Sequence, residues 1–295
     1  MPRPLAGDFE RIYDPSVGER ESWYINDHTF FRGRDGTWHL IGITHAEPMA
    51  PFDEVDFGHA TAQNLRGPWT KQHHALSASI AAGEHHLWAP HVIHHEDLFW
   101  MFYCAGGPSP QEYRIHLATS EDGWKWHRHP ANPLIVDGYE ARDPMVVWID
   151  GRWIMYYTAT ESPAGGHHIV AAAESTDLAR WEGRHIVYRD QLQGTLGGPT
   201  ESPFVVECDG EFHLFIGPDW EKLTAALDAG NDDPAAYRRT RVFESSNPLS
   251  FDLDGQIATI DAHAAEVIVD LDGSYWVSHC GWGQGGIYLA PLFWS

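Results

Sequence analysis

Three carboxylates stand at nearly the same place in three separate segments of this chain. Asp27, Asp143 and Glu201 each lie eight or nine residues before the glycine of a predicted tight turn, and a strongly apolar run follows each of them. The apolar runs indicate buried strands, so each carboxylate borders a confined cavity. A charge there is costly unless it is paired or used, which marks a candidate functional site. Two carboxyl groups in one cavity, one protonated and one ionised, can exchange protons with a substrate.

A structural origin for these carboxylates has to be weighed. The chain holds 42 acidic residues, most of which must lie on the solvated surface. An Asp before Pro, as at Asp143, can also simply cap a turn. Either explanation would suffice for one carboxylate alone. Three at one position of a repeat are better explained by a shared function.

The segments that carry these residues belong to a repeat. Strand–turn–strand patterns recur five times, and successive turns are spaced 54 to 63 residues apart; they lie at Gly36, Asp97, Gly151, Gly210 and Gly273. Four of the five have Asp-Gly or an equivalent at the turn, which is a strong hairpin signal. A small-residue strand, a polar turn and an aromatic residue follow each of the first four hairpins. Each unit can therefore form four antiparallel strands.

Five such units predict an all-β fold, a single five-bladed β-propeller over residues 1–295 with four-stranded antiparallel blades. The fifth unit has too few strands, so we expect the N-terminal segment 8–13 to close the last blade. Long helical periodicity is absent, and the best helical candidate, around Trp220 to Ala229, is short. A jelly roll or sandwich would not explain the fivefold repeat. In a propeller the inner strands converge, which would bring the three carboxylates together.

Composition and charge exclude several classes of protein. Aromatic residues make up 13% of the chain, which rules out disorder. The formal charge of −23 argues against nucleic acid or an anionic membrane as a partner. No apolar run approaches the ~20 residues of a membrane helix. Three scattered cysteines, expected to be buried free thiols, and an N-terminal stretch without signal-peptide features predict a cytoplasmic location.

Motifs at the inner positions resemble those of the five-bladed propeller glycoside hydrolases, the superfamily that holds families 43 and 32. The motifs come from all five units: WYINDHTFF with Asp27, WAPHV with Trp88, ARDPMVV with Asp143, TESPFVV with Glu201, and DAHAAEVI with His263. Two features depart from the pattern: His91 stands where an acidic residue usually follows Trp-Ala-Pro, and the Asp-Pro-Asn of fructosidases is missing. The chain is thus similar to family 43, with some family 32 features.

The resemblance implies a role for each carboxylate. Glu201 would be the general acid, Asp27 the base or nucleophile, and Asp143 the group that raises the pKa of Glu201. Arg142 would contact substrate hydroxyls or hold Asp143 ionised. Members of family 43 invert the anomeric centre and members of family 32 retain it; the Trp-Ala-Pro segment and His263 favour inversion here.

The resemblance also places candidates around the carboxylates. The residues predicted to bind substrate are Asn26, Trp88, His91, Arg142, Trp23 and Trp282, and Tyr24 is a further stacking candidate. His263 sits where many family 43 members carry a histidine near a central cation. It could border a hydrated structural Ca²⁺ in the central channel through water, and no cofactor is otherwise expected.

These observations imply a hydrolase that removes terminal furanosyl or pentosyl residues, of arabinofuranoside or xyloside type, from short oligosaccharides with inversion. A retaining β-fructofuranosidase-like hydrolase and a glycoside phosphorylase on the same fold are alternatives, although a phosphorylase needs a basic phosphate site. A non-catalytic sugar-binding propeller is the alternative of another class, and it would not need three matched carboxylates. The sequence leaves the sugar, the linkage and the oligomeric state open.

Overall fold

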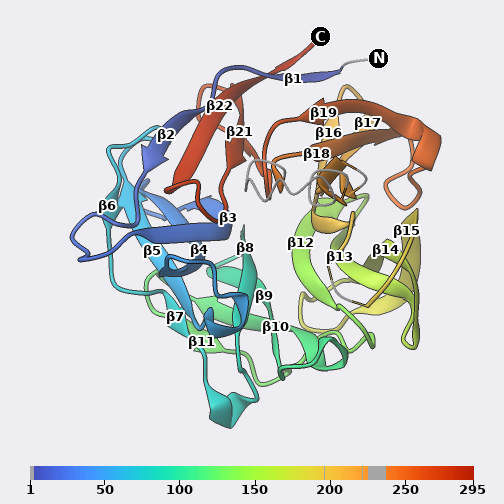
Figure 1. Cartoon of the computed structure of the whole chain (residues 1–295), viewed down its shortest axis with the longest axis horizontal. Coiled ribbons are helices and arrows are strands. Elements are labelled where there is room, and N and C mark those ends of the chain that lie inside the picture. Colours follow the sequence, from blue (N-terminus) through green and yellow to red (C-terminus); the bar gives the residue numbers. More distant parts are fainter. Residues whose placement is uncertain (1–2, 196, 221, 225–236) are drawn as a thin grey trace.

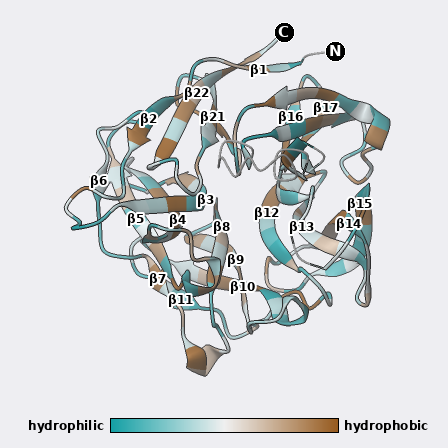
Figure 2. Ribbon diagram, viewed as in Figure 1, coloured by the Kyte–Doolittle hydropathy of each residue, from teal (hydrophilic) through white to brown (hydrophobic). Residues whose placement is uncertain are grey.

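Short runs of alternating hydrophobic and polar residues form the strands of this protein, as expected for sheets with a buried face. The computed structural model describes residues 3–195, 197–220, 222–224 and 237–295. Within them the strands form five antiparallel sheets, arranged as blades around a common centre (Figure 1). Brown and teal segments alternate along many of the strands in Figure 2. The predicted five-bladed propeller is confirmed.

The blades follow one another along the chain, each with its inner strand first. Blade 1 contains β3 (Trp23–Arg32), β4 (Trp38–Ala46), β5 (Asp56–Ala62), β6 (Thr70–Lys71) and β7 (Leu76–Ser77). Blade 2 contains β8 (Leu87–His95), β9 (Leu98–Gly106), β10 (Tyr113–Ser120) and β11 (His127–Arg128). Blade 3 contains β12 (Arg142–Ile149), β13 (Arg152–Ser162), β14 (Gly165–Ser175) and β15 (Glu182–Gln193). Blade 4 contains β16 (Glu201–Cys208), β17 (Glu211–Gly217), β18 (Thr240–Ser245) and β19 (Gln256–Ile260).

Blade 5 is built from both ends of the chain. Its C-terminal strands are β20 (Val267–Val269), β21 (Tyr275–His279) and β22 (Ile287–Trp294). Two N-terminal strands, β1 (Pro4–Ala6) and β2 (Glu10–Tyr13), both pair antiparallel with β22, and β1 lies beside β22 in Figure 1. The predicted closing segment 8–13 is therefore found as β2. The pairing of β1 was not predicted, because three residues carry too little pattern to be recognised.

The turns within the hairpins have the backbone that their residues favour. Asp150 and Gly151 have φ values of 50° and 83°, and Asp209 and Gly210 have 53° and 83°. Positive φ at both central residues is what the two-residue hairpin turn requires, and Asp-Gly adopts it readily. These turns set the register of β12–β13 and β16–β17, and thereby the height at which the inner strands begin.

Short helical turns connect some of the strands. The 3₁₀ turns are Pro51–Asp53, Ile80–Ala82, Pro110–Glu112 and Leu253–Gly255. Residues 220 and 222–224 are helical, as predicted for the start of the segment Trp220 to Ala229, and the rest of that segment lies outside the described residues. None of the helices in the described ranges is long and apolar enough to cross a membrane. The three cysteines are buried free thiols, as predicted.

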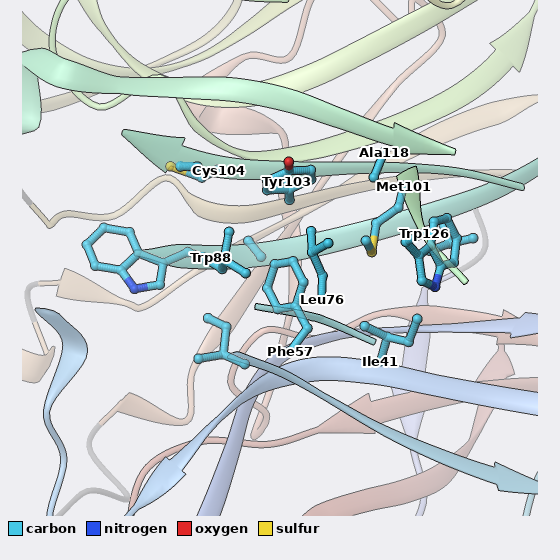
Figure 3. Close-up of a cluster of buried hydrophobic side chains, with 14 of the residues drawn as sticks. Ile41, Phe57, Leu76, Trp88, Met101, Tyr103, Cys104, Ala118 and Trp126 are labelled. Atoms are coloured by element: carbon cyan, nitrogen blue, oxygen red, sulfur yellow. The ribbon is translucent and has the colours of Figure 1, made fainter. Parts of the chain in front are cut away.

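Apolar side chains fill the spaces between neighbouring blades. Figure 3 shows the cluster between blades 1 and 2, in which Trp88 lies at one end and Trp126 at the other. Ile41 and Phe57 of blade 1 meet Met101 of blade 2 in this cluster, and all three are fully buried. Each such side chain stabilises the fold by about 1.5–3 kcal/mol. The packing holds the inner strands in place, and these strands carry the predicted site.

Candidate active site

A backbone irregularity lies at the start of each inner strand, a register shift in blades 1 to 4 and a positive φ in blades 2 to 5. In blade 1 the register shifts between Asn26 and His28, which makes Asp27 the extra, bulged residue. Blades 2, 3 and 4 have shifts of the same kind, between Trp88 and His91, Arg142 and Met145, and Glu201 and Phe204. The bulged residues Ala89, Asp143 and Ser202, and Ala264 in blade 5, have φ values of 46° to 54°. A bulge re-aims the side chains beside it.

The residues at the start of the inner strands, or just before it in blade 5, form two rings. The upper ring consists of Asn26, Trp88, Arg142, Glu201 and His263, all of which line a cavity of about 210 Å³. The lower ring consists of Asp27, Ala89, Asp143, Ser202 and Ala264, all of which border a smaller cavity of about 30 Å³. Asp27, Asp143 and Ser202 reach the larger cavity as well. All three predicted carboxylates therefore meet in one cavity.

The equivalence predicted among the three carboxylates is wrong by one position for Glu201. Ser202, not Glu201, is the bulged residue of blade 4 and the structural counterpart of Asp27 and Asp143. Glu201 occupies the upper ring, at the position of Arg142 in blade 3. Counting from the turn glycine missed this difference because the turn of blade 1, between Arg32 and Trp38, is longer than the two-residue turns of blades 3 and 4.

Asp27 is held by hydrogen bonds to both of its oxygens. The Ser202 hydroxyl donates to Oδ1 at 2.6 Å, and the Asn26 amide donates to Oδ2 at 3.3 Å. Burial raises the pKa of Asp27, and the nearby charge of Asp143 adds to the rise. The carboxyl group thus has a fixed orientation in the cavity and titrates above the ordinary range for Asp.

Asp143 and Arg142 form a buried ion pair at the centre of the site. Arg142 Nη1 lies 2.5 Å from Asp143 Oδ2, and both side chains are less than a tenth exposed. The same oxygen accepts the Ser202 backbone N–H at 3.0 Å and the Thr158 hydroxyl at 3.4 Å. A carboxylate that accepts several hydrogen bonds on one oxygen is held in place and orients its neighbours.

Glu201 faces Arg142 across the boundary between blades 3 and 4. Arg142 Nη2 donates to Glu201 Oε1 at 3.0 Å. Burial nevertheless raises the pKa of Glu201 to about 8, because the charges of Asp143 and Asp27 oppose the effect of Arg142. At neutral pH Glu201 therefore holds a proton that it can donate.

The predicted aromatic residues divide between the cavity and the core. Trp88 and Trp282, two of the predicted substrate-binding residues, line the cavity. The Trp88 Nε1 donates to the Pro51 carbonyl at 3.0 Å. Tyr24 is completely buried and donates its hydroxyl to Glu54 at 2.7 Å, so it cannot stack on a sugar.

Two residues predicted to bind substrate lie elsewhere. Trp23 lies under Lys71, whose Nζ is 5.3 Å from the indole ring, and it does not line the cavity. Side chains alternate along β3, so Trp23 points to the face opposite to Asn26 and Tyr24. His91 follows the bulge of β8 and borders the smaller cavity, where Nε2 lies 3.1 Å from the Val146 carbonyl oxygen.

His263 is a wall of the cavity. Its ring lies 5.4 Å from that of Tyr237 and 5.7 Å from that of Trp282. Burial lowers the pKa of His263 to about 3, so the imidazole is neutral, and Nε2 is buried with no hydrogen-bond partner among the described residues. Across the described ranges, no group of three or more His, Cys, Asp or Glu side chains is arranged to hold a metal ion. Any cation beside His263 would have to be held largely through water.

The structure adds residues to the site that sequence reasoning missed. Glu54, Phe52 and Tyr237 line the cavity, and Ser202 joins the three blades that carry the carboxylates. Glu54 and Phe52 come from the β4–β5 connection. The repeat pattern identifies only the starts of the inner strands, so it does not point to this connection. Ser202 could have been noticed, because it is directly before a proline, as Asp143 is.

Solved structures with the same fold include members of two glycoside hydrolase families. A thermostable family-43 glycoside hydrolase is 17% identical, with a TM-score of 0.66 over 96% of this chain and 92% of that chain. A GH32 beta-fructofuranosidase of Bombyx mori is 18% identical, with a TM-score of 0.65 over 98% of this chain and 61% of that chain. At these identities the likeness shows the shared propeller fold.

Curated relatives are similar in sequence as well. A probable sucrose-6-phosphate hydrolase of Vibrio cholerae serotype O1 is 24% identical over 274 residues, which are 88% of this chain and 47% of that protein. Arabinan endo-1,5-alpha-L-arabinosidase A of Aspergillus niger is 26% identical over 180 residues, which are 57% of this chain and 49% of that protein. The chain spans about half the length of these curated relatives.

The family comparison covers most of the propeller. Residues 19–261 match the family described as glycosyl hydrolases family 32 N-terminal domain. This range includes the inner strands of blades 1 to 4 and with them Asp27, Asp143 and Glu201. The chain therefore belongs to the glycosyl hydrolases family 32 N-terminal domain family.

Proposed function

We propose that this chain is a glycosidase that removes a terminal furanosyl or pentosyl residue from short oligosaccharides by acid–base catalysis. The observation that supports this most directly is the meeting of Asp27, Asp143 and Glu201, from three blades, in one cavity. The cavity measures about 210 Å³. Pockets for drug-sized ligands are about 300–1,000 Å³. A site below that range suits one sugar unit, which favours the removal of terminal residues.

In this proposal the carboxylates have different tasks. Glu201 gives its proton to the leaving oxygen, because its raised pKa keeps it protonated at neutral pH. Asp27 acts on the opposite side of the sugar ring, in the orientation fixed by Ser202 and Asn26. Asp143 keeps the pKa of Glu201 high and fixes Arg142 beside it. The developing positive charge on the sugar is stabilised by the surrounding carboxylates.

The stereochemical course depends on what Asp27 does. If it activates a water molecule, the anomeric centre inverts, as the Trp-Ala-Pro segment and His263 lead us to expect. If its oxygen attacks the anomeric carbon, a covalent glycosyl intermediate forms and water then restores the original configuration. The family 32 match over residues 19–261 favours this second candidate, a retaining β-fructofuranosidase-like hydrolase.

A phosphorylase and a non-catalytic propeller have less support from the cavity. A glycoside phosphorylase needs a cation free to bind phosphate, but Arg142, the cation among the described residues that line the cavity, is paired with Asp143 and Glu201. A non-catalytic sugar-binding propeller would not need a buried carboxyl group whose pKa is raised to about 8.

A panel of substrates tests the proposal. The protein is incubated with aryl α-L-arabinofuranoside, aryl β-D-xyloside, short arabino-oligosaccharides and sucrose, and the first anomer released is identified by NMR. We expect hydrolysis of at least one substrate, and a loss of about 10²–10⁴-fold in the Glu201→Gln variant on the natural oligosaccharides. An inverted first product supports the base role of Asp27, and a retained one supports the nucleophile role. Lack of hydrolysis across the whole panel would overturn the proposal.

A cation beside His263 is proposed separately. A Ca²⁺ held through water would bind only the folded protein and stabilise it by mass action. Removal with a chelator should then lower the melting temperature or the activity, and added Ca²⁺ should restore it. If neither quantity responds, His263 acts only as an aromatic wall of the cavity.

A further inference from the structure

The cavity of the candidate active site contains a fourth carboxylate, which lies outside the inner strands. Glu54 follows the 3₁₀ turn Pro51–Asp53 in the β4–β5 connection, is 1% exposed, and lines the cavity together with Asp27, Asp143 and Glu201. The charge of Asp27 contributes to raising the pKa of Glu54, which places the two groups within electrostatic reach.

One oxygen of Glu54 is fixed by two aromatic donors. The Tyr24 hydroxyl donates to Oε1 at 2.7 Å and the Trp282 indole N–H donates to the same atom at 3.2 Å. The Trp88 indole also approaches Glu54 and lowers its pKa, although its N–H donates to Pro51. Among the described residues no hydrogen bond reaches Oε2, which leaves that oxygen for a ligand in the cavity that Glu54 lines.

A structural role does not explain why this residue is charged. A glutamine could accept the hydrogen bonds from Tyr24 and Trp282 through its amide oxygen, without the cost of several kcal/mol for burying an ion. Burial raises the pKa of Glu54 to about 7, so the residue is ionised above neutral pH in spite of that cost. We therefore expect the charge of Glu54 to contribute to binding a ligand in the cavity.

The charge balance of the cavity indicates the kind of ligand. Four carboxylates line it, and Arg142, the cation among its described lining residues, is already paired with two of them. Above neutral pH, where Asp27 and Glu54 are ionised, a phosphate group would meet uncompensated negative charge. Hydroxyl groups, which donate hydrogen bonds to carboxylates, would be bound favourably.

We infer that Glu54 is a specificity-determining residue, whose carboxylate binds hydroxyl groups of a neutral terminal sugar and discriminates against phosphorylated sugars. This inference rests on the proposed function for the identity of the ligand as a sugar. It concerns the choice of substrate, and it holds for either stereochemical course.

The test measures binding, so that it does not depend on turnover. Tryptophan fluorescence, which reports on Trp88 and Trp282, is followed at pH 8 during titration with D-fructose and D-xylose, each beside its phosphate monoester. The wild-type protein should bind a neutral sugar at least tenfold more tightly than the corresponding phosphate. Glu54→Gln should weaken neutral binding by about 10-fold to 100-fold, the worth of a hydrogen bond to a charged group, and should reduce the discrimination at least tenfold.

Two further variants control for charge and for folding. Asp53→Asn removes a charge from the neighbouring exposed residue and should leave the discrimination unchanged. Glu54→Asp keeps the charge, but its shorter side chain moves the carboxylate away from the ligand. This variant should therefore bind neutral sugars more weakly and still discriminate against the phosphate monoesters. If Glu54→Gln does not fold, Glu54→Asp carries the test, and unchanged neutral binding in that variant would contradict the inference.

The inference and the proposed function fail in different ways. Equal discrimination in Glu54→Gln and wild type, or wild-type binding that is tighter for the phosphate or absent for every sugar, overturns the inference. Discrimination as expected, with no hydrolysis of any glycoside, overturns the proposed function and leaves a binding site for neutral sugars. A lower melting temperature with unchanged discrimination would reduce Glu54 to an anchor of its loop.

Discussion

The inner strands of blades 3 and 4 begin with the same backbone and different chemistry. Blade 3 starts Arg-Asp-Pro and blade 4 starts Glu-Ser-Pro, and the middle residues Asp143 and Ser202 have φ values of 54° and 48°. Each start has the same bulge against the second strand. The side chains complement one another across the blades: Arg142 binds Glu201, and the Ser202 N–H binds Asp143.

This difference shows that the repeat supplies the backbone geometry, whereas individual side chains supply the chemistry. Blades 2 and 5 have the same left-handed backbone at Ala89 and Ala264, with no group that could act on a substrate. Left-handed φ at a residue other than glycine costs of order 1–3 kcal/mol and is often associated with functional sites. Here it occurs with and without chemistry, so it belongs to the architecture, and the function is carried by the side chains placed on it.

Asp27→Asn should have the largest effect among changes at these positions. The amide can neither attack carbon nor accept a proton, so we expect a loss of about 10⁴-fold in kcat, at the upper end of the worth of one acid–base group. The loss should be equal for a natural oligosaccharide and for an aryl glycoside with an acidic phenol. The measurement is kcat on both substrates, with Asp53→Asn as the surface control. A loss that depends on the leaving group would assign the acid role to Asp27.

Glu201→Gln tests the upper ring in the same way. A natural leaving group needs a proton, so kcat should fall by about 10²–10⁴-fold. An acidic phenol departs without one, so the loss on the aryl glycoside should be much smaller. The ratio of the two losses is the quantity to measure. A ratio near one would show that Glu201 does not protonate the leaving group.

Asp143→Asn should shift the pH profile of kcat/KM, and this shift is more informative about the role of Asp143 than the loss of activity. The raised pKa of Glu201, about 8, sets the basic limb of kcat/KM, because activity is lost as Glu201 deprotonates; ionisation of Asp27 sets the acidic limb. The Asp143 charge raises both pKa values, so its removal lowers both. The profile should shift to lower pH, in addition to a lower maximum. A shift to higher pH, or none, would refute the role of Asp143.

Ala89→Gly should have the smallest effect and tests the architectural half of the comparison. Glycine relieves the left-handed strain at this position but gives the unfolded chain more freedom, and the two effects nearly cancel. We expect a change in the free energy of unfolding within about 1 kcal/mol, measured by urea denaturation. The matched control, Ala118→Gly in the regular part of β10, should be destabilised by about 0.5–1 kcal/mol or more. Equal losses in both variants would mean that the bulge is not strained.

The sequence predicted the parts of this molecule that depend on local pattern. Asp-Gly turns and alternating strands define the blades, and the three carboxylates follow from their distance to those turns. The one-residue displacement of Glu201 was not predicted in this way, because the longer turn of blade 1 makes equal distances from the turn glycine reach different positions. Trp23 and His91 were misplaced by the same kind of local detail, strand alternation in one case and the β8 bulge in the other.

Glu54 escaped prediction for a different reason. It lies in an irregular connection, and its position depends on contacts with Tyr24 and Trp282, which are 30 and 228 residues away along the chain. Hydrogen bonds over such separations leave no pattern in a single sequence. Residues of this kind complete a site whose framework the repeat supplies.

The pairing of β1 with β22 brings the two ends of the described chain together. Arg3 and Ser295 exchange backbone hydrogen bonds of 2.8 and 3.1 Å, so the two ends of the described chain lie side by side. A short linker could join them, and the chain could then be reopened at an exposed hairpin such as Asp150–Gly151, in the manner of a circular permutation. In the permuted protein blade 5 would come from one continuous segment, and blade 3, opened at this hairpin, would instead be built from both ends of the chain. During synthesis, β1 is made first but can pair only after β22, the last strand of the chain, has been made. The permutation would therefore also change which blade closes last during folding.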